Sequence, residues 1–376
     1  MALMKHYFSR IVVKVGSNVL ARPDGTPDVT RMSALVDQIA GLRRMGIEVI
    51  LVSSGAVASG RSELHPVRKL DCVDQRQLFS AVGQVKLINR YYELFREYGI
   101  TVAQVLTMKE SFATRRHYLN QKNCMVVMLE NGVLPVVNEN DTIAVSELMF
   151  TDNDELSGLI ASMMDAQALL ILTNVDGIYD GPPSLPSSQV IREIRSGEDI
   201  SGCIQTARSG FGRGGMLTKT GIARKVADEG IAVFIANGRR ENVLTEILKY
   251  EALRMEQNAP ALPDPPFAYT RFVPAARSVS GVKKWIAHSE GFAKGAIYLN
   301  SQAAELLLSD KAVSVLPVGV VAVGGEFEKD DIVRILHADG TPIGVGKTNF
   351  SSAEVREAAG KHGKKPVVHY DYLYME

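Results

Sequence analysis

The sequence predicts an α/β protein: a three-layer, open, mainly parallel sheet between helices, followed by a small β-rich domain. Short runs rich in β-branched residues recur along the first part, with longer helical patterns between them. These runs are apolar throughout instead of alternating with polar residues, as expected of parallel strands that are covered on both faces. A break crowded with prolines, near residue 260, separates this part from the rest.

Six runs are expected to form the strands of the first domain. They cover residues 10–15, 48–53, 101–106, 133–138, 168–173 and 231–236. Between the first two, residues 28–46 place apolar side chains at helical spacing, and Gly46 is a plausible stop for that helix. Ligands bind beyond the carboxyl ends of strands in open parallel sheets, so the residues that end each run are the first candidates for a site.

The second domain is expected after a linker in which four prolines fall within seven residues. We predict a first domain over residues 1–258, a linker over 259–279 and a second domain over 280–376. Short β segments follow the linker at residues 295–300, 319–325, 331–336 and 342–348. Gly346, Lys347 and Thr348 imitate the end of a Walker motif, but Thr341 stands where that motif needs glycine, so we interpret the segment as a hairpin strand.

Composition limits the classes of partner. The chain has 42 Lys and Arg and 42 Asp and Glu, so no global positive charge attracts nucleic acid or an anionic membrane. Cys72, Cys124 and Cys203 form no CxxC pair, which argues against a disulfide framework or a zinc site and favours the reducing cytoplasm. We expect neither a signal peptide nor a membrane helix, because the N-terminus lacks an apolar core and the longest apolar stretch is interrupted at Pro317.

The strand ends are unusually rich in small and polar residues. Lys14 lies in a run that should be buried, where a charge needs an anion, and Gly16 has no side chain to keep a phosphate from the backbone. A lysine that reaches water from an edge strand is the alternative. Other strand ends supply Ser54 and Gly55 after the second run, Asp141 after the fourth, and Thr173 and Asn174 at the fifth.

Residues 211–219 form a glycine-rich loop that ends at Lys219 and precedes a helical pattern. Glycines let backbone N–H groups surround a phosphate, and a helix N-terminus favours negative charge. The spacing is not that of a P-loop. Taken alone, a flexible surface loop explains this segment as well as a phosphate site does.

Asp152 and Asp154 lie two positions apart before an apolar stretch. A calcium loop is excluded, because Leu156 and Ser157 stand where an EF-hand needs Asp or Asn and then Gly. Asp152 followed by Glu155 instead resembles a capping box, which leaves Asp154 to be explained.

A phosphoryl transfer to a carboxylate would use such an aspartate. A carboxylate acceptor is already ionised at pH 7 and needs no general base, so catalysis reduces to bringing two anions together and neutralising charge. Two lysines from different loops, held by one aspartate, would suffice. Lys14, Lys219 and Asp154 match that description.

Six motifs occur in order: VVKVGSNVL, VILVSSGAVASG, SAVGQ, PVVNENDTIAV, TDNDELSGLIA and GRGGMLTK. Together they resemble the glutamate 5-kinases of the amino acid kinase family. Residues from about 282 onward, which include Trp285, resemble the PUA domain of the longer bacterial forms. The resemblance implies the amino acid kinase fold and ATP-dependent phosphorylation of the γ-carboxylate of L-glutamate, the first step of proline biosynthesis.

The resemblance also implies residue roles. Lys14 and Lys219 would stabilise the transition state, with Asp154 organising both. The substrate would be bound by Ser54, Gly55, Asp141, Asp152 and Asn153. ATP would be bound by Lys14, Gly16, Thr173, Asn174, Arg213, Gly214, Gly215, Met216, Leu217, Thr218 and Lys219. Asn174 stands where the family often has Asp, and Arg213 and Leu217 stand where it often has Thr and Ser. Mg²⁺ would arrive with ATP, without a dedicated protein cage.

Family members are inhibited by proline and form homodimers or homotetramers, and we expect the same here. Another kinase of the same family, acting on acetylglutamate, aspartate or carbamate, is the main alternative. PUA domains commonly bind RNA, but residues 280–376 contain 11 Lys and Arg against 12 Asp and Glu, which is no basic footprint.

Overall fold

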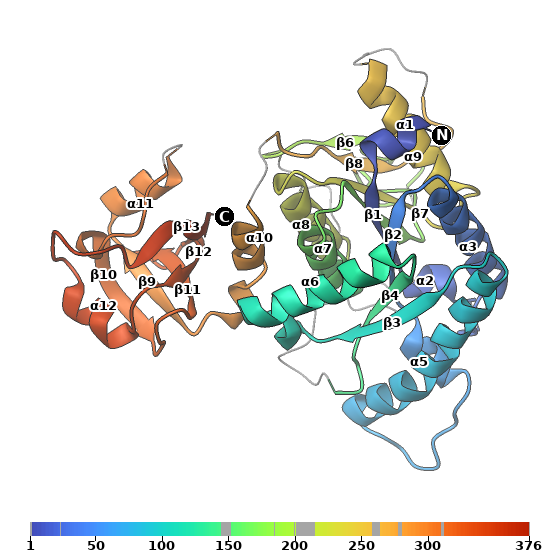
Figure 1. Cartoon of the computed structure of the whole chain (residues 1–376), viewed down its shortest axis with the longest axis horizontal. Helices are drawn as coiled ribbons and strands as arrows, with labels where there is room; N and C mark the ends of the chain where they lie inside the picture. The colour runs from blue at the N-terminus through green and yellow to red at the C-terminus, as the bar shows by residue number, and fades with distance from the viewer. Residues whose placement is uncertain are drawn as a thin grey trace. The chain divides into compact units, whose positions relative to one another are not determined.

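The computed structural model describes residues 2–22, 24–143, 152–183, 185–198, 200, 215–257, 264–276, 280–309 and 312–375. The chain divides into two compact units (Figure 1). Unit 1 comprises Met1–Ser111 and Leu119–Ser278, and unit 2 comprises Phe112–Tyr118 and Val279–Glu376. Within the described residues, no helix is long and apolar enough to cross a membrane.

Unit 1 is built on a sheet that has eight strands in the described part of the chain, in the order β3-β4-β2-β1-β5-β7-β8-β6. The strands are β1 (Arg10–Val15), β2 (Glu48–Ser53), β3 (Val102–Thr107), β4 (Leu134–Glu139), β5 (Ala168–Thr173), β6 (Glu193–Ile194), β7 (Ala232–Asn237) and β8 (Thr270–Phe272). Neighbouring strands run parallel from β3 to β7, and β8 pairs antiparallel with β7. The six predicted strands are all present, three of them displaced by one residue, and the fold-class prediction is confirmed.

Helices cover both faces of this sheet. The helices of unit 1 and of its connection to unit 2 are α1 (Ala2–Tyr7), α2 (Ser17–Leu20), α3 (Val29–Arg44), α4 (Ala56–Arg61), α5 (Cys72–Arg96), α6 (Arg115–Glu130), α7 (Asn153–Met163), α8 (Met216–Asp228) and α9 (Val243–Gln257), with the 3₁₀ turn η1 (Lys109–Phe112). One buried cluster joins α3, α5 and α9 to alternate residues of β1, β2, β4, β5 and β7. Helices α7 and α8 pack together, α7 against β1 and β5 and α8 against β7. The predicted helix between the first two strands is confirmed as α3, with Gly46 at a φ of 80° beyond its end.

Alternation along β1 determines where Lys14 points. Ile11, Val13 and Val15 belong to the cluster with α3 and α9, so Val12 and Lys14 point to the opposite face, where α7 packs. Because α7 begins beside the end of β1, the Lys14 amine meets the first turn of that helix. Lys14 is therefore buried with an acidic partner, and the edge-strand alternative is wrong.

Unit 2 contains a sheet that, among the described residues, has five strands in the order β10-β9-β11-β12-β13. They are β9 (Gly295–Leu299), β10 (Val320–Gly325), β11 (Ile332–His337), β12 (Pro342–Thr348) and β13 (Val368–Met375), accompanied by α10 (Gly281–Ala287), α11 (Ser301–Leu308), α12 (Ser352–Ala358) and the 3₁₀ turns η4 (Glu290–Phe292) and η5 (Pro317–Gly319). Strands β11 and β12 pair antiparallel, which confirms that the Walker-like segment is a hairpin strand.

Candidate functional site

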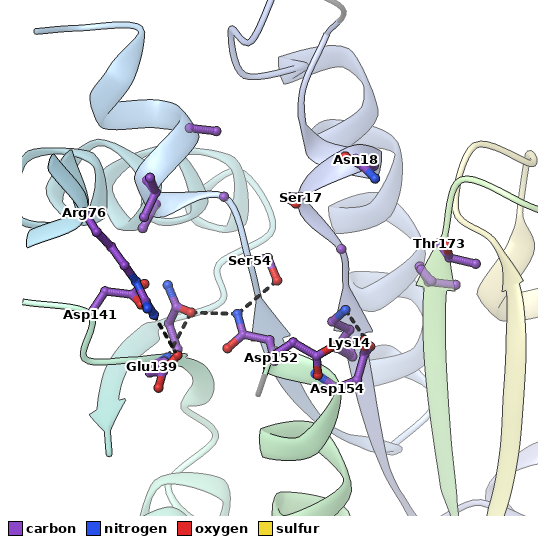
Figure 2. Close-up of a pocket in the computed structure, with 18 of the residues that line it drawn as sticks. Lys14, Ser17, Asn18, Ser54, Arg76, Glu139, Asp141, Asp152, Asp154 and Thr173 are labelled. Carbon is purple, nitrogen blue, oxygen red and sulfur yellow. Dashed lines mark hydrogen bonds and ion pairs between the residues drawn. The ribbon is translucent and has the colours of Figure 1, made fainter. Parts of the chain in front are cut away.

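A cavity of about 500 Å³ lies at the carboxyl ends of β1, β2, β4 and β5 (Figure 2). The chain leaves β1 for β2 on one side, whereas β5 pairs with β1 on the other side. Such a reversal of strand order opens a crevice beyond the strand ends, where ligands bind in open α/β sheets. The predicted site residues that line the cavity are Lys14, Gly16, Ser54, Gly55, Asp141, Asp152, Asn153, Asp154, Thr173, Asn174 and Lys219.

Two glycines shape the cavity wall after β1 and β2. The Gly16 N–H donates to the Leu172 carbonyl at 3.1 Å, and a Cβ at Gly16 would lie only 3.2 Å from that oxygen. Gly55 has a φ of 105°, in the left-handed region that favours glycine. Because neither residue has a side chain, the main chain at both positions is exposed to the cavity, where a ligand can approach it.

Asp154 joins the two predicted lysines. Its Oδ1 lies 2.6 Å from Lys14 Nζ, and its Oδ2 lies 2.9 Å from Lys219 Nζ. Burial alone would raise the pKa of Asp154, but the two ammonium groups outweigh burial and hold the pKa at about 2. The carboxylate is thus ionised at neutral pH, and it fixes two cations from different elements at one point of the cavity.

Asp152 caps α7, as predicted. Its Oδ1 accepts from Asp154 N at 2.9 Å and from Glu155 N at 3.2 Å. The Glu155 carboxylate lies 2.9 Å from Lys109 Nζ. Burial and the negative charge of Asp154 raise the pKa of Asp152 to about 7. Two neighbouring aspartates therefore have opposite shifts, because only Asp154 contacts both lysines.

An amide network fixes the middle of the cavity. Asn153 Nδ2 donates to Ser54 Oγ and to Asn138 Oδ1, each at 2.9 Å. Asn138 Nδ2 in turn donates to Gln84 Oε1 at 2.8 Å. Asn153 is thereby held in one orientation between the ends of β2 and β4. Asn138 and Gln84 were not among the predicted site residues.

Asp141 lies at one end of the cavity in an acidic cluster with Arg76 and Glu139 (Figure 2). The Arg76 guanidinium forms ion pairs with Asp141 and with Glu139, the second at 3.2 Å. Burial raises the pKa of Asp141, although Arg76 opposes the rise. Glu139 could have been found from its place at the end of the fourth strand. Nothing in the sequence indicates that Arg76 is a site residue, because it stands in an ordinary polar stretch of α5.

The end of the glycine-rich segment forms the N-terminus of helix α8. Helix α8 begins at Met216, two residues before the predicted helical pattern, so Lys219 lies in the first turn of α8 and not in a loop. Gly215, Met216, Leu217 and Thr218 are not among the described residues that line the cavity. Arg213 and Gly214 lie outside the described residues.

Residues 9–237 match the amino acid kinase family, and the match covers more than half of the chain. This chain belongs to that family. Residues 295–370 match the PUA domain, which confirms the interpretation of the C-terminal part.

Three curated relatives of this amino acid kinase share the name glutamate 5-kinase. The chain is 70% identical to a glutamate 5-kinase of Bacteroides thetaiotaomicron over 99% of this chain and 100% of the relative. It is 44% identical to a glutamate 5-kinase of Chlorobaculum tepidum over 98% of both chains. A glutamate 5-kinase of Trichlorobacter lovleyi is 38% identical over 93% of this chain and 89% of the relative. The resemblance found from the motifs is confirmed.

Proposed function

We propose that this amino acid kinase is a glutamate 5-kinase, which transfers the γ-phosphoryl group of ATP to the γ-carboxylate of L-glutamate. The product is L-glutamyl 5-phosphate, the first intermediate of proline biosynthesis. The observation that carries the proposal is the contact of buried Asp154 with both Lys14 and Lys219, found in a chain whose relatives are named glutamate 5-kinase.

The geometry suits a reaction between two anions. A carboxylate oxygen of glutamate forms a bond to the γ-phosphorus, while the bond from that phosphorus to the bridging oxygen breaks and ADP leaves. The acceptor is ionised, so the enzyme needs to supply no base. Lys14 and Lys219 neutralise charge on the transferring group, and Asp154 keeps their positions fixed before the reaction begins.

Glutamate binds on the side of the cavity formed by β2, β4 and the start of α7. Ser54 and Gly55 lie beside the acceptor carboxylate, and Asn153 is held there by the amide network. Asp141 provides a negative partner for the substrate ammonium at the far end. Asp152 lies at the edge of this subsite.

ATP binds on the side of β1, β5 and α8. Gly16, Thr173 and Asn174 line this part of the cavity. The first N–H groups of a helix lack intrahelical partners, so the start of α8, from Gly215 through Met216, Leu217 and Thr218 to Lys219, suits a phosphate. Arg213 and Gly214, which come directly before Gly215 in the sequence, are further proposed ATP contacts.

Mg²⁺ would be bound mainly by phosphate oxygens and water, and it would neutralise charge on the triphosphate. Within the described residues, Asp152 Oδ2 is buried without a hydrogen-bond partner. That oxygen would accept a hydrogen bond from a water molecule bound to Mg²⁺, so the site fits a water-mediated contact between the ion and Asp152. The described residues contain no group of three or more His, Cys, Asp or Glu arranged to hold a metal.

Several further properties are proposed from the sequence and from the resemblance. They are a catalytic domain over residues 1–258, a linker over 259–279, a PUA-like domain over 280–376, a cytoplasmic location, feedback inhibition by proline and assembly as a homodimer or homotetramer. RNA binding by the PUA-like domain has no support from its charge.

The proposal is tested by a coupled ADP-release assay with ATP and each acceptor in turn: L-glutamate, N-acetyl-L-glutamate, L-aspartate and carbamate. Turnover with L-glutamate at least a hundredfold above the others is expected. Preference for another acid would assign the chain to a different kinase of the same family.

A further inference from the structure

The turn that follows β7, residues 237–240, is joined to two segments that line the cavity. The Gly238 N–H donates to the Thr173 carbonyl at 2.8 Å, and Arg239 Nη2 donates to the Asn18 carbonyl at 3.1 Å. Figure 2 shows Asn18 and Thr173 on the side of the labelled residues away from Asp141. Residues 237–240 are not themselves among the described residues that line the cavity. The turn therefore supports the cavity wall without facing the space that a ligand would fill.

Gly238 packs tightly between α2 and β5. A Cβ on Gly238 would lie 2.7 Å from Val19 Cγ1 and 3.1 Å from Leu172 Cβ. A side chain at this position would therefore displace one of the two segments. The positions of α2 and of the end of β5 are thus linked through the turn.

The Asn18 carbonyl needs a donor from outside its own helix. Helix α2 ends at Leu20, and a helical carbonyl normally accepts from the N–H four residues later. That N–H belongs to Arg22, and it donates instead to the Thr26 carbonyl at 2.8 Å. Arg239 supplies a donor, as basic side chains do at the C-terminal ends of many helices.

The two arginines of the turn have different electrostatic environments. Arg240 donates through Nε and Nη2 to the two carboxylate oxygens of Asp176, at 3.0 and 2.7 Å. Asn237 Nδ2 donates to the same carboxylate at 3.0 Å, and the hydrogen bonds from Arg240 and Asn237 hold the pKa of Asp176 below its ordinary value. Arg239 instead contacts an uncharged carbonyl. The pair with Asp176 fixes the backbone from which Arg239 reaches Asn18.

We propose that Arg239 is a positioning residue for ATP. It holds the turn after β1, which carries the proposed ATP contact Gly16, in the arrangement that receives the phosphates. The Arg240–Asp176 pair fixes the turn from which it acts. This inference rests on the proposed function, in which ATP binds beside β1 and β5, and it gives a role to residues that have none there.

A general contribution to stability is the competing explanation. Arg239 is exposed, so its replacement leaves no hole in the core and the variant should fold. If Arg239 only stabilised the domain, its loss would lower the unfolding free energy and would change the binding of both substrates alike. The test must therefore compare ATP with glutamate.

The experiment compares wild type with Arg239→Met and Arg239→Lys. Methionine is unbranched and cannot donate a hydrogen bond, whereas lysine keeps a charged donor. Steady-state kinetics give kcat and both KM values, calorimetric titration gives the Kd of a non-hydrolysable ATP analogue with Mg²⁺, and urea unfolding gives stability. Arg90→Met is the matched control, because it removes an arginine from an exposed pair with Glu93.

For Arg239→Met, KM for ATP and the Kd of the analogue should rise about fivefold or more, because the lost hydrogen bond has a charged donor. KM for glutamate and kcat should stay within about twofold, since the glutamate side of the cavity is not joined to this turn. Arg239→Lys should recover most of the affinity for the analogue. Arg90→Met should match wild type in every measurement.

An analogue Kd within twofold of wild type in Arg239→Met, or an equal rise of KM for both substrates, would overturn the inference and leave the proposed function intact. Absence of turnover with L-glutamate in the wild type would instead refute the proposed function. The titration of the ATP analogue would still decide the role of Arg239, because it requires no acceptor.

Discussion

At the scale of single residues, the proposed chemistry depends on the way Asp154 holds two positive charges in place. The buried carboxylate between Lys14 and Lys219 stabilises the buried ammonium of Lys14 and the partly buried one of Lys219, and it sets where both lie. In the proposed function, the lysines would meet the transferring phosphoryl group without first moving into place. Preorganised charge of this kind acts most strongly on the transition state.

Replacement of Lys219 by alanine should therefore affect turnover more than binding. We expect kcat to fall by about a hundredfold or more, with a smaller change in KM for glutamate, because the lost charge acts mainly in the transition state. Steady-state kinetics with both substrates measure this. Lys86→Ala, which removes a lysine from an exposed pair with Glu63, is the control. A kcat within twofold of wild type would remove Lys219 from the catalytic groups.

Asp152 makes stability depend on pH. Its pKa of about 7 in the folded protein lies above the ordinary value of 3.8, so the folded state keeps the proton longer. The stabilisation is complete below about pH 4 and is lost as pH rises through about 7. Asp154 is the opposite case: its pKa of about 2 gives stability that persists at neutral pH and is lost only as pH falls through about 2.

The Asp152→Asn variant tests this sign. Asparagine can still cap α7 but cannot ionise. From about pH 5.5 to about pH 8, wild type should lose about 1–2 kcal/mol of unfolding free energy relative to the variant. Urea unfolding at both pH values measures the difference. A constant difference between the two proteins would show that Asp152 has an ordinary pKa.

At the scale of elements, the crossing of α4 and α5 supports the part of the cavity that Ser54, Gly55 and Arg76 line. Helix α4 follows Ser54 and Gly55, and α5 carries Arg76. The two helices meet at glycines: a Cβ on Gly83 would lie 1.8 Å from the Ala56 carbonyl oxygen, and one on Gly60 would lie 1.9 Å from the Phe79 carbonyl oxygen. Only glycine permits backbones to approach this closely.

Gly83→Ala should force α4 and α5 apart. We expect a loss of about 2–3 kcal/mol in unfolding free energy and a raised KM for glutamate, because the clash is with backbone that cannot rotate away. Urea unfolding and kinetics measure the two effects. Gly41→Ala in α3 is the matched control: nothing lies within 4 Å of its added Cβ, and it should stabilise by about 0.5–1 kcal/mol. Equal stability of both variants would contradict the close crossing.

At the scale of the whole molecule, unit 2 includes a segment from the middle of the chain. Phe112–Tyr118, which precedes and begins α6, groups with residues after 278. Trp285 Nε1 donates to the Phe112 carbonyl at 3.0 Å, and the Arg115 guanidinium lies 6.0 Å from the Trp285 ring centre. Unit 2 thus depends on contacts between residues more than 160 positions apart.

Trp285→Phe should weaken unit 2 without changing catalysis. The variant keeps an aromatic ring but loses the indole donor and its hydrogen bond to the Phe112 carbonyl, which should cost about 1–2 kcal/mol. Calorimetry should show a lower unfolding temperature, while kcat and KM stay within twofold, since Trp285 does not line the cavity. Tyr370→Phe, at an exposed position of unit 2, serves as control. A loss of activity equal to the loss of stability would connect Trp285 to the site.

Much of the site could be predicted from the sequence, because the carboxyl ends of parallel strands lie side by side. Lys14, Asp154 and Lys219 could be proposed as a unit from their residue types and from the family resemblance, and the structure places each lysine amine within 2.9 Å of an Asp154 oxygen. Arg76 and Gln84 could not, because a polar residue on a long helix looks the same whether it faces water or a cavity. Which face of α5 turns inward is decided by its packing against α4.

The sequence by itself determined the α/β architecture, the position of the strands, the cap at Asp152 and the family. These follow from local patterns of hydrophobicity and from motifs whose residues are near one another in the chain. Only the tertiary structure decided that Lys14 faces α7, that Asp152 and Asp154 have opposite pKa shifts, and that Arg76 completes an acidic cluster at the end of the cavity. Each of these depends on the charges and backbone that distant segments bring within a few ångströms, which no local pattern specifies.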